Sequence, residues 1–236
     1  MFGRLLGTVN LQKPRWLTIG QKLTSTLAPP LCVLCGGPGQ LGDELWGLDL
    51  CRYCQAACPK PPIDPPGGGL DVLRALFLYA DPADRLVTGL KFRGELACAR
   101  VLGTLLARHI QEADIRLPQV LVPMPLHASR YRERGFNQAE AIAAHVAART
   151  RVTLDKSLLQ RVRATAPQTT LNAAERRRNC AGAFAVSPGR HAPTRVALLD
   201  DVMTTGSTAT AAAEALRAAG ARHVELWVCA VAPRYG

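Results

Sequence analysis

The alternation of apolar and polar positions predicts a series of strands and helices from Leu70 onward. Short apolar runs indicate buried strands, and apolar residues three and four positions apart indicate helices. We expect strands at Leu73–Tyr79, Gln119–Val122, Val196–Leu199 and Val224–Val231, and helices at Pro82–Leu90, Glu95–Ile110, Gln138–Arg149 and Thr208–Ala219. The segment Arg163–Ala173 lacks either pattern and is predicted to be a loop.

The last strand, helix and strand form a βαβ unit between Val196 and Val231, with Gly220 placed to end the helix. Because such a crossover joins parallel strands, we expect an α/β fold with a mainly parallel central sheet flanked by helices.

The N-terminal quarter of the chain divides into three parts. Residues 1–30 are predicted to contain a short amphipathic helix around Trp16–Leu27. Residues 31–59 are rich in cysteine, and residues 60–69 read KPPIDPPGGG, which predicts a linker. The α/β domain then occupies residues 70–236. The sequence has no apolar run of the roughly 18 residues that a membrane span needs and no secretory signal pattern, so we expect a cytoplasmic protein.

Four cysteines form two C-x-x-C pairs, Cys32 with Cys35 and Cys51 with Cys54, separated by fifteen residues. Four thiolates at this spacing predict a closed, structural Zn²⁺ site. Two redox-active dithiols or disulfides are the alternative; they are disfavoured because the pairs are close and the segment has little core of its own. Cys58 is out of register with the pairs and is not assigned as a ligand.

The strand predicted at Val196–Leu199 delivers two carboxylates, Asp200 and Asp201, to its C-terminal end. A loop of small residues and a helix follow, with Thr204, Thr205, Gly206, Ser207 and Thr208. Hydroxyls and free N–H groups at a helix start bind a phosphate, whereas carboxylates accept hydrogen bonds from a vicinal diol. A ribose 5-phosphate unit presents a diol at one end and a phosphate at the other, which matches an acidic pair followed by a hydroxylated loop.

An ordinary strand–turn–helix with Thr and Ser as helix caps is the alternative for this segment, but it leaves the adjacent aspartates without a role. A Walker-A phosphate loop is excluded because no Gly-Lys-Ser/Thr follows.

The chain has a net charge of +11, which points to anionic partners such as phosphorylated small molecules or nucleic acid. Between Arg130 and Arg178, eleven basic residues face only four acidic ones, so most of the excess charge lies there.

The stretch Val196–Thr208 resembles the thirteen-residue phosphoribosyl pyrophosphate (PRPP) fingerprint of type I phosphoribosyltransferases. Further segments resemble the ComF/GntX family, namely Leu90–Gly94, Val122–Leu126, Arg134–Gln138, Thr165 with Gln168 and Leu171, Arg176–Phe184, and the four-cysteine module. The resemblance covers about Pro29–Pro233. It implies a type I phosphoribosyltransferase fold preceded by a zinc ribbon, and an association with competence, the uptake of DNA in natural transformation. It supplies no nucleobase pocket.

By the same resemblance, pyrophosphate is expected at the loop Pro123–Gly135. The candidates are Arg130 and Arg134, with Lys91 and Arg93 able to reach the same anions; a solvated basic face is the alternative. The segment from Arg163 to Asn179 is a candidate lid, with Arg163, Gln168, Arg177 and Asn179 as its contact residues, or a groove for single-stranded nucleic acid.

Two functions follow from the sequence and stay open. The first is an enzyme that displaces pyrophosphate from PRPP with Mg²⁺ bound to the substrate, with Asp201 favoured over Asp200 as proton acceptor. The second is a non-catalytic adaptor that handles single-stranded DNA or contacts DNA-uptake proteins and keeps a vestigial or sensory nucleotide site. The oligomeric state is not indicated by the sequence.

Overall fold

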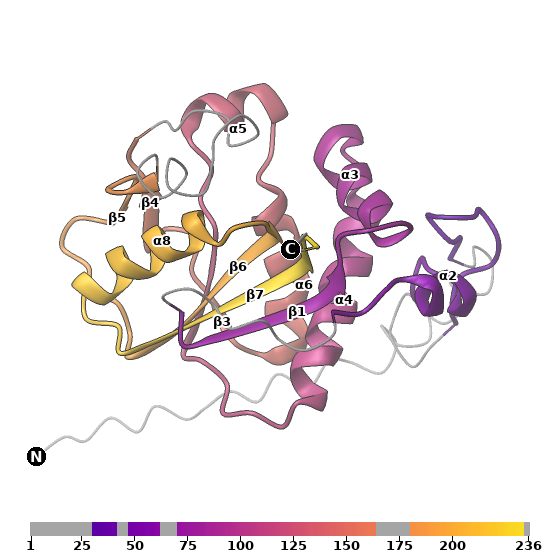
Figure 1. Cartoon of the computed structure of the whole chain (residues 1–236), viewed down its shortest axis with the longest axis horizontal. Helices are drawn as coiled ribbons and strands as arrows, with labels where there is room; N and C mark the ends of the chain where they lie inside the picture. The colour runs from indigo at the N-terminus through magenta and orange to yellow at the C-terminus, as the bar shows by residue number, and fades with distance from the viewer. Residues whose placement is uncertain (1–29, 42–46, 62–69, 164–179, 234–236) are drawn as a thin grey trace, which may run out of the picture.

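The computed structural model describes residues 30–41, 47–61, 70–163 and 180–233. Their largest element is a five-stranded parallel sheet with strand order β1–β7–β6–β2–β3 (Figure 1). The strands are β1 (Val72–Leu78), β2 (Val120–Pro123), β3 (Thr153–Leu154), β6 (Arg195–Met203) and β7 (His223–Val231). The four predicted strands are therefore confirmed, and β3 is a short edge strand that the pattern did not indicate.

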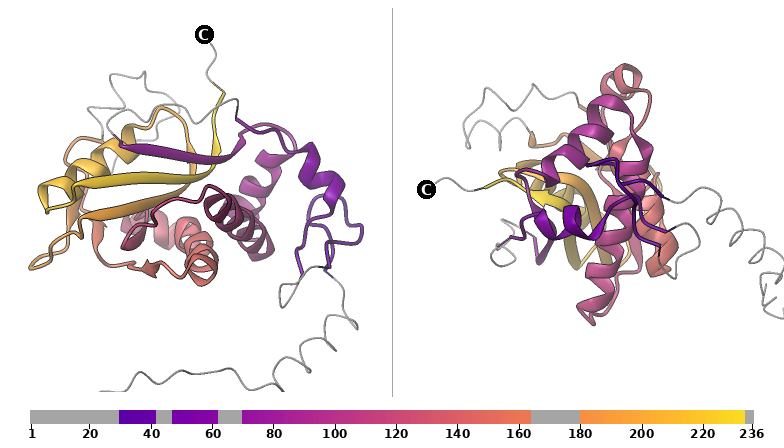
Figure 2. Two further views of the ribbon diagram at one scale, coloured as in Figure 1. Left: turned by 90° about the horizontal axis from the view of Figure 1, so that it is seen from below. Right: turned by 90° about the vertical axis from the view of Figure 1, so that its right-hand side faces the viewer.

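Helices cover both faces of this sheet. On one face lie α4 (Leu96–Glu112) and α6 (Gln138–Thr150), with α3 (Ala83–Arg93) packed against α4, and on the other lies α8 (Ser207–Ala218) (Figure 2). Because β7 is covered on both faces, its residues from Val224 to Val231 are all buried. The predicted α/β class is confirmed, and the four predicted helices end within three residues of their expected limits.

Two regions differ from the sequence-based expectation. The segment Pro123–Gly135, expected as a loop, contains the short helix α5 (Ala128–Arg134), which His127 caps by accepting a hydrogen bond from the Ser129 N–H. Downstream, β4 (Leu159–Arg161) and β5 (Phe184–Val186) form a separate antiparallel pair. The predicted helix at Trp16–Leu27, most of the linker, and the loop beyond Arg163 lie outside the described residues.

The cysteine-rich module packs directly on the α/β domain. Its helix α2 (Arg52–Ala57) follows two isolated β-bridges, and Leu48 and Leu50 are buried in the same continuous core as the sheet. Arg100 of α4 forms an ion pair with the buried Asp49 of the module, and Arg85 of α3 donates to the Leu34 carbonyl at 3.2 Å. The module is thus part of one folded unit with the domain.

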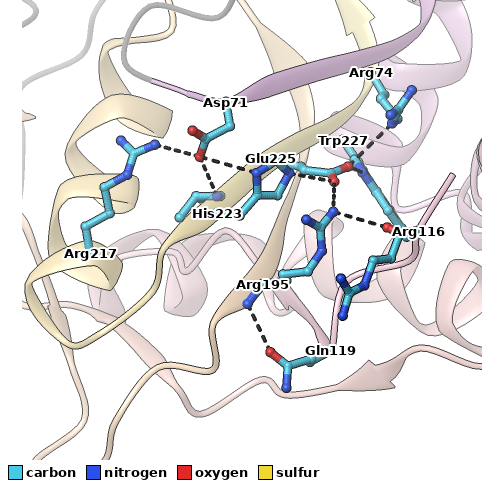
Figure 3. A network of polar contacts seen from close by, with 10 residues as sticks. Asp71, Arg74, Arg116, Gln119, Arg195, Arg217, His223, Glu225 and Trp227 are labelled. Carbon is cyan, nitrogen blue, oxygen red and sulfur yellow. Dashed lines mark hydrogen bonds and ion pairs between the residues drawn. The ribbon is translucent and has the colours of Figure 1, made fainter.

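A polar network closes the N-terminal end of the sheet (Figure 3). Glu225 of β7 is buried and accepts hydrogen bonds from the Trp227 indole at 3.0 Å and from Arg195 at 3.2 Å; it also faces Arg74 at 3.4 Å and His223 at 3.0 Å. Two arginines offset the charge of the buried carboxylate, which would otherwise cost several kcal/mol to desolvate. The network therefore holds β1, β6 and β7 together at the end opposite the strands' C-termini.

Candidate functional site

A cavity of about 440 Å³ opens at the C-terminal ends of the strands. This is the edge at which α/β sheets bind their ligands. Because β2 pairs with β6 up to Pro123 and Leu199, the segments that follow the two strands lie side by side, and Met124 N–H donates to the Leu199 carbonyl at 2.8 Å. The predicted site residues that line the cavity are Lys91, Arg130, Arg134, Asp200, Asp201, Thr204, Gly206, Ser207 and Thr208.

The acidic pair lies inside the sheet rather than beyond it. Strand β6, expected to end at Leu199, continues to Met203 because β7 is long enough to pair with Asp200, Val202 and Met203. Successive side chains of a strand point to opposite faces, so the two carboxylates approach the cavity from different sides. The longer strand gives each carboxylate a different set of neighbours.

Asp201 is buried, and its Oδ2 lies 2.8 Å from the Lys91 ammonium at the end of α3. Burial alone would lower the pKa of Lys91, but the charge of Asp201 outweighs it and raises that pKa, so Lys91 is charged. Burial, with the neighbouring charge of Asp201, raises the pKa of Asp200 to about 7. Asp200 is therefore the member of the pair whose pKa lies near neutrality, while Asp201 is the one in contact with Lys91.

The segment after β6, residues Thr204–Thr208, is the one that the sequence predicted to bind phosphate, and we call it the phosphate cradle. Gly206 adopts the left-handed conformation, with φ of 78°, and is the N-cap of α8. An added Cβ there would meet only Met203 Sδ, at 3.6 Å, so the backbone angle rather than lack of space favours glycine. Thr204, Ser207 and Thr208 line the cavity; Thr205 does not, and its hydroxyl lies 3.0 Å from that of Ser207.

Four cationic side chains line the same cavity, namely Lys91, Arg130, Arg134 and Arg161. Arg134 donates to Gln138 Oε1 at 2.5 Å and lies over the Phe92 ring at 6.0 Å. Four positive charges against two carboxylates make the cavity attractive to anions. Arg93, proposed from the sequence as a further pyrophosphate contact, does not line the cavity; it is held away by a bidentate ion pair with Glu95.

Sequence reasoning did not identify Arg161 and Phe92 as site residues. Arg161 lies on β4, and its guanidinium stacks over the Phe184 ring of β5 at 5.5 Å. Leu159, Arg161 and Arg163 are two positions apart in turn. This spacing places both arginines on one side of a strand and was a signal for a short strand here. Asn137 caps α6, since its side chain accepts from Ala139 N–H, and it also donates to the Met124 carbonyl, both at 3.0 Å.

Of the candidate lid residues, the structure describes Arg163, which donates to the Ala181 carbonyl at 2.7 Å. Gln168, Arg177 and Asn179 lie outside the described residues. The β4–β5 pair nevertheless brings both ends of this segment to the cavity, because Arg161 lines it and Cys180 Sγ lies 3.7 Å from the hydroxyl of Thr208, which also lines it.

The cysteine module brings together the four thiols predicted to bind metal. The Sγ atoms of Cys32, Cys35, Cys51 and Cys54 all lie within 4.8 Å of one another, and those of Cys35 and Cys51 are 3.8 Å apart. Bonds of 2.3 Å to a tetrahedral Zn²⁺ require sulfurs separated by about 3.8 Å, so the donor set fits that ion.

Local backbone geometry in this module also suits thiolates. Gly36 N–H donates to the Cys32 carbonyl at 2.8 Å, and Cys54 N–H donates to Cys51 Sγ at 3.3 Å. Burial opposes ionisation of Cys32, but hydrogen bonds from neighbouring backbone groups outweigh it and lower the pKa of Cys32 to about 6. Cys58, left out of the predicted set, instead donates to the Cys54 carbonyl at 3.3 Å.

The parallel sheet has helices on both faces, and the acidic pair of β6 is followed by a short loop and α8; this is the phosphoribosyltransferase-type fold that the sequence resemblance implied. The chain is 33% identical to competence protein F of Haemophilus influenzae over 155 residues, covering 63% of this chain and 68% of that protein. It is 32% identical to the DNA utilization protein YhgH of Escherichia coli over 225 residues, covering 84% and 96% respectively. The chain belongs to the ComF family.

Other comparisons are weaker. Competence protein ComFC of Streptococcus pneumoniae is 27% identical, over 74% of this chain and 72% of that protein. Among solved structures, the allosteric regulatory enzyme of purine biosynthesis is 22% identical with a TM-score of 0.35, over 55% of this chain and 25% of that one. A hypoxanthine phosphoribosyltransferase of Staphylococcus aureus is 14% identical with the same TM-score, over 55% and 61%. No family model matches the chain.

Within the described residues, none of the helices combines the length and the apolar character that crossing a membrane requires.

Proposed function

We propose that this protein binds a ribose 5-phosphate ligand, with PRPP as the principal candidate, at Asp200–Thr208. The observation that carries the proposal is that the acidic pair and the phosphate cradle open into one cavity lined by four cations. A phosphate monoester gains from the N–H groups and hydroxyls at the start of α8, and from the helix dipole. The ribose diol donates to the carboxylates.

The pyrophosphate of PRPP would contact the arginines that line the cavity. These are Arg130 and Arg134 of α5 and Arg161 of β4, and guanidinium groups match phosphate oxygens in pairs. Mg²⁺, bound to oxygens of the ligand itself, would neutralise the diphosphate and favour its departure. Arg134 is already oriented by Gln138, so little side-chain freedom is lost when the anion binds.

If the protein turns PRPP over, a nitrogen nucleophile replaces pyrophosphate at C1, and the carboxylates stabilise the positive charge that develops on the sugar. Asp200 is then the better proton acceptor, because its pKa of about 7 lies near the working pH, whereas Asp201 is engaged by Lys91. This reverses the preference for Asp201 drawn from the sequence alone.

Calorimetry on zinc-loaded protein tests the binding proposal. PRPP and ribose 5-phosphate are expected to bind at submillimolar concentration with Mg²⁺ present. Replacing both aspartates, as Asp200→Asn with Asp201→Asn, should preserve binding of inorganic phosphate while weakening ribose 5-phosphate about 10- to 100-fold, as expected for lost charged hydrogen bonds. Asp114→Asn, on the exposed turn after α4, is the matched control. Absence of binding of PRPP, ribose 5-phosphate and nucleoside monophosphates at millimolar concentration would refute the proposal.

A second candidate function, handling of single-stranded DNA, is supported by the relatives' names, competence protein F and DNA utilization protein. The basic excess between Arg130 and Arg178 is its chemical basis. Replacing Arg176 and Arg177 by Ala should then weaken binding and reduce the slope of log affinity against log salt by about one to two units. Each single replacement, Arg176→Ala or Arg177→Ala, is compared with Arg222→Ala, which removes one exposed charge just before β7. An unchanged slope would favour the lid interpretation.

A further inference from the structure

Lys91 occupies an unusual position for a lysine, because it reaches the acidic pair from a separate helix. It lies in the last turn of α3, where the helix dipole favours a cation, and the left-handed Gly94 is the C-cap of that helix. Its ammonium lies 2.8 Å from Asp201 Oδ2, and both side chains line the ligand cavity. The side chain of Asp201 is 5% exposed and that of Lys91 is 26% exposed, so the contact is partly shielded from water.

The charges around this contact leave little need for a metal. In the described part of the chain, the acidic groups lining the cavity are Asp200 and Asp201, and Lys91, Arg130, Arg134 and Arg161 already oppose them. A divalent cation placed beside the acidic pair would lie within a few ångströms of the Lys91 ammonium. Like charges at that distance repel strongly in a partly buried site. A pyrophosphate group is different, because it brings its own negative charges for Mg²⁺.

We infer that Lys91 supplies, at the acidic pair, the positive charge that a divalent cation would otherwise supply, so that the ribose 5-phosphate half of the ligand binds without Mg²⁺ and only the pyrophosphate half depends on the metal. This inference rests on the proposed function for its ligand. Lys91 is a specificity-determining residue on this view: it sets which part of the ligand requires metal.

Wild-type protein provides the first test. Affinities for ribose 5-phosphate and PRPP are measured by calorimetry in buffer freed of Mg²⁺ by a resin, and again in the same buffer with millimolar MgCl₂. A chelator is avoided, since it would compete for the four-cysteine site. Ribose 5-phosphate affinity should change less than about twofold, whereas PRPP affinity should rise at least about tenfold. A tenfold dependence of ribose 5-phosphate on Mg²⁺ would overturn the inference.

Variants provide the second test. In Lys91→Met, ribose 5-phosphate binding should weaken about tenfold without Mg²⁺ and recover with it, while Lys91→Arg should behave like wild type. Lys60→Met, which removes the same charge outside the cavity, should have no effect. A Lys91→Met protein that folds and binds equally with and without Mg²⁺ would contradict the inference.

A ligand-free measurement separates this inference from the proposed function. Mn²⁺ binding, followed by electron paramagnetic resonance, should be absent at the acidic pair of wild type and should appear in Lys91→Met, then disappear when Asp201→Asn is added. If no sugar phosphate binds any variant, the proposed function fails, and the Mn²⁺ result still decides the role of Lys91. Mn²⁺ binding to wild type that is lost in Asp201→Asn would refute it.

Discussion

Replacing Gly206 by alanine isolates the phosphate cradle from the rest of the site. Gly206 has a φ of 78° and is the N-cap of α8, and its carbonyl accepts the first helical hydrogen bond, from Thr210 N–H at 2.8 Å. The Cβ of an alanine would have room, since its nearest neighbour is Met203 Sδ at 3.6 Å. The substitution therefore perturbs the backbone angle and little else.

The magnitude follows from that angle. A residue with a Cβ in the left-handed region costs about 1–2 kcal/mol, which lowers Tm by about 2–8 °C in a domain of this size. The loop can relieve the strain by rotating away from positive φ, and the N–H groups of Ser207 and Thr208 then turn away from the phosphate. Losing one charged hydrogen bond costs about 1.5–3 kcal/mol, or roughly 10- to 100-fold in affinity. Gly206→Val should be worse on both measures, because branching stiffens the side chain.

Gly189→Ala is the matched control. Its φ is 73°, an added Cβ would meet nothing within 4 Å, and it lies in the turn between β5 and β6, outside the cavity. Both variants should lose similar stability in thermal unfolding, but only Gly206→Ala should lose affinity for ribose 5-phosphate and inorganic phosphate in calorimetry. If Gly206→Ala binds phosphate as wild type does, the loop does not hold the phosphate through its backbone, and the reasoning fails.

Three further outcomes are expected. Purified protein should carry about one Zn²⁺ per chain by elemental analysis, and Cys51→Ser should lose it. Metal-free protein with the four clustered cysteines disulfide-bonded in reducing buffer would contradict the zinc site. Between about pH 4 and 7 the folded state keeps a proton on Asp200 that the unfolded state has lost, so the free energy of unfolding falls as pH rises through that window. In urea unfolding at pH 8, Asp200→Asn should therefore be more stable than wild type by about 1 kcal/mol or more. An equal or lower stability of the variant would argue against the raised pKa. In the same assay, Glu225→Ala should lower the free energy of unfolding by about 3–5 kcal/mol, because Arg195 loses its buried partner, while phosphate affinity stays unchanged. A loss below about 1 kcal/mol would show that the network in Figure 3 is not needed for stability.

The local pattern of the sequence was sufficient to predict the elements that depend on near neighbours. Apolar runs located β1, β2, β6 and β7, because strands covered on both faces must be apolar along their length. The two cysteine pairs predicted a four-thiol site, which the structure confirms as a geometric cluster, since Cys32 and Cys35 flank one turn and Cys51 and Cys54 lie at the start of α2. The order of acidic pair, hydroxylated loop and helix likewise placed the candidate ligand site at Asp200–Thr208.

Tertiary structure decided which side chains meet at that site. Strand β6 extends past Leu199 because β7 offers it partners, and no local signal in β6 records the length of its neighbour. Lys91 and Arg93 are two residues apart on α3, yet Lys91 reaches Asp201 while Glu95 draws Arg93 away. Arg161 joins the cavity through the pairing of β4 with β5, two segments separated by 22 residues. Such choices depend on contacts between segments distant in the chain, so the sequence by itself determined the kinds of chemistry present, and the packing determined their partners.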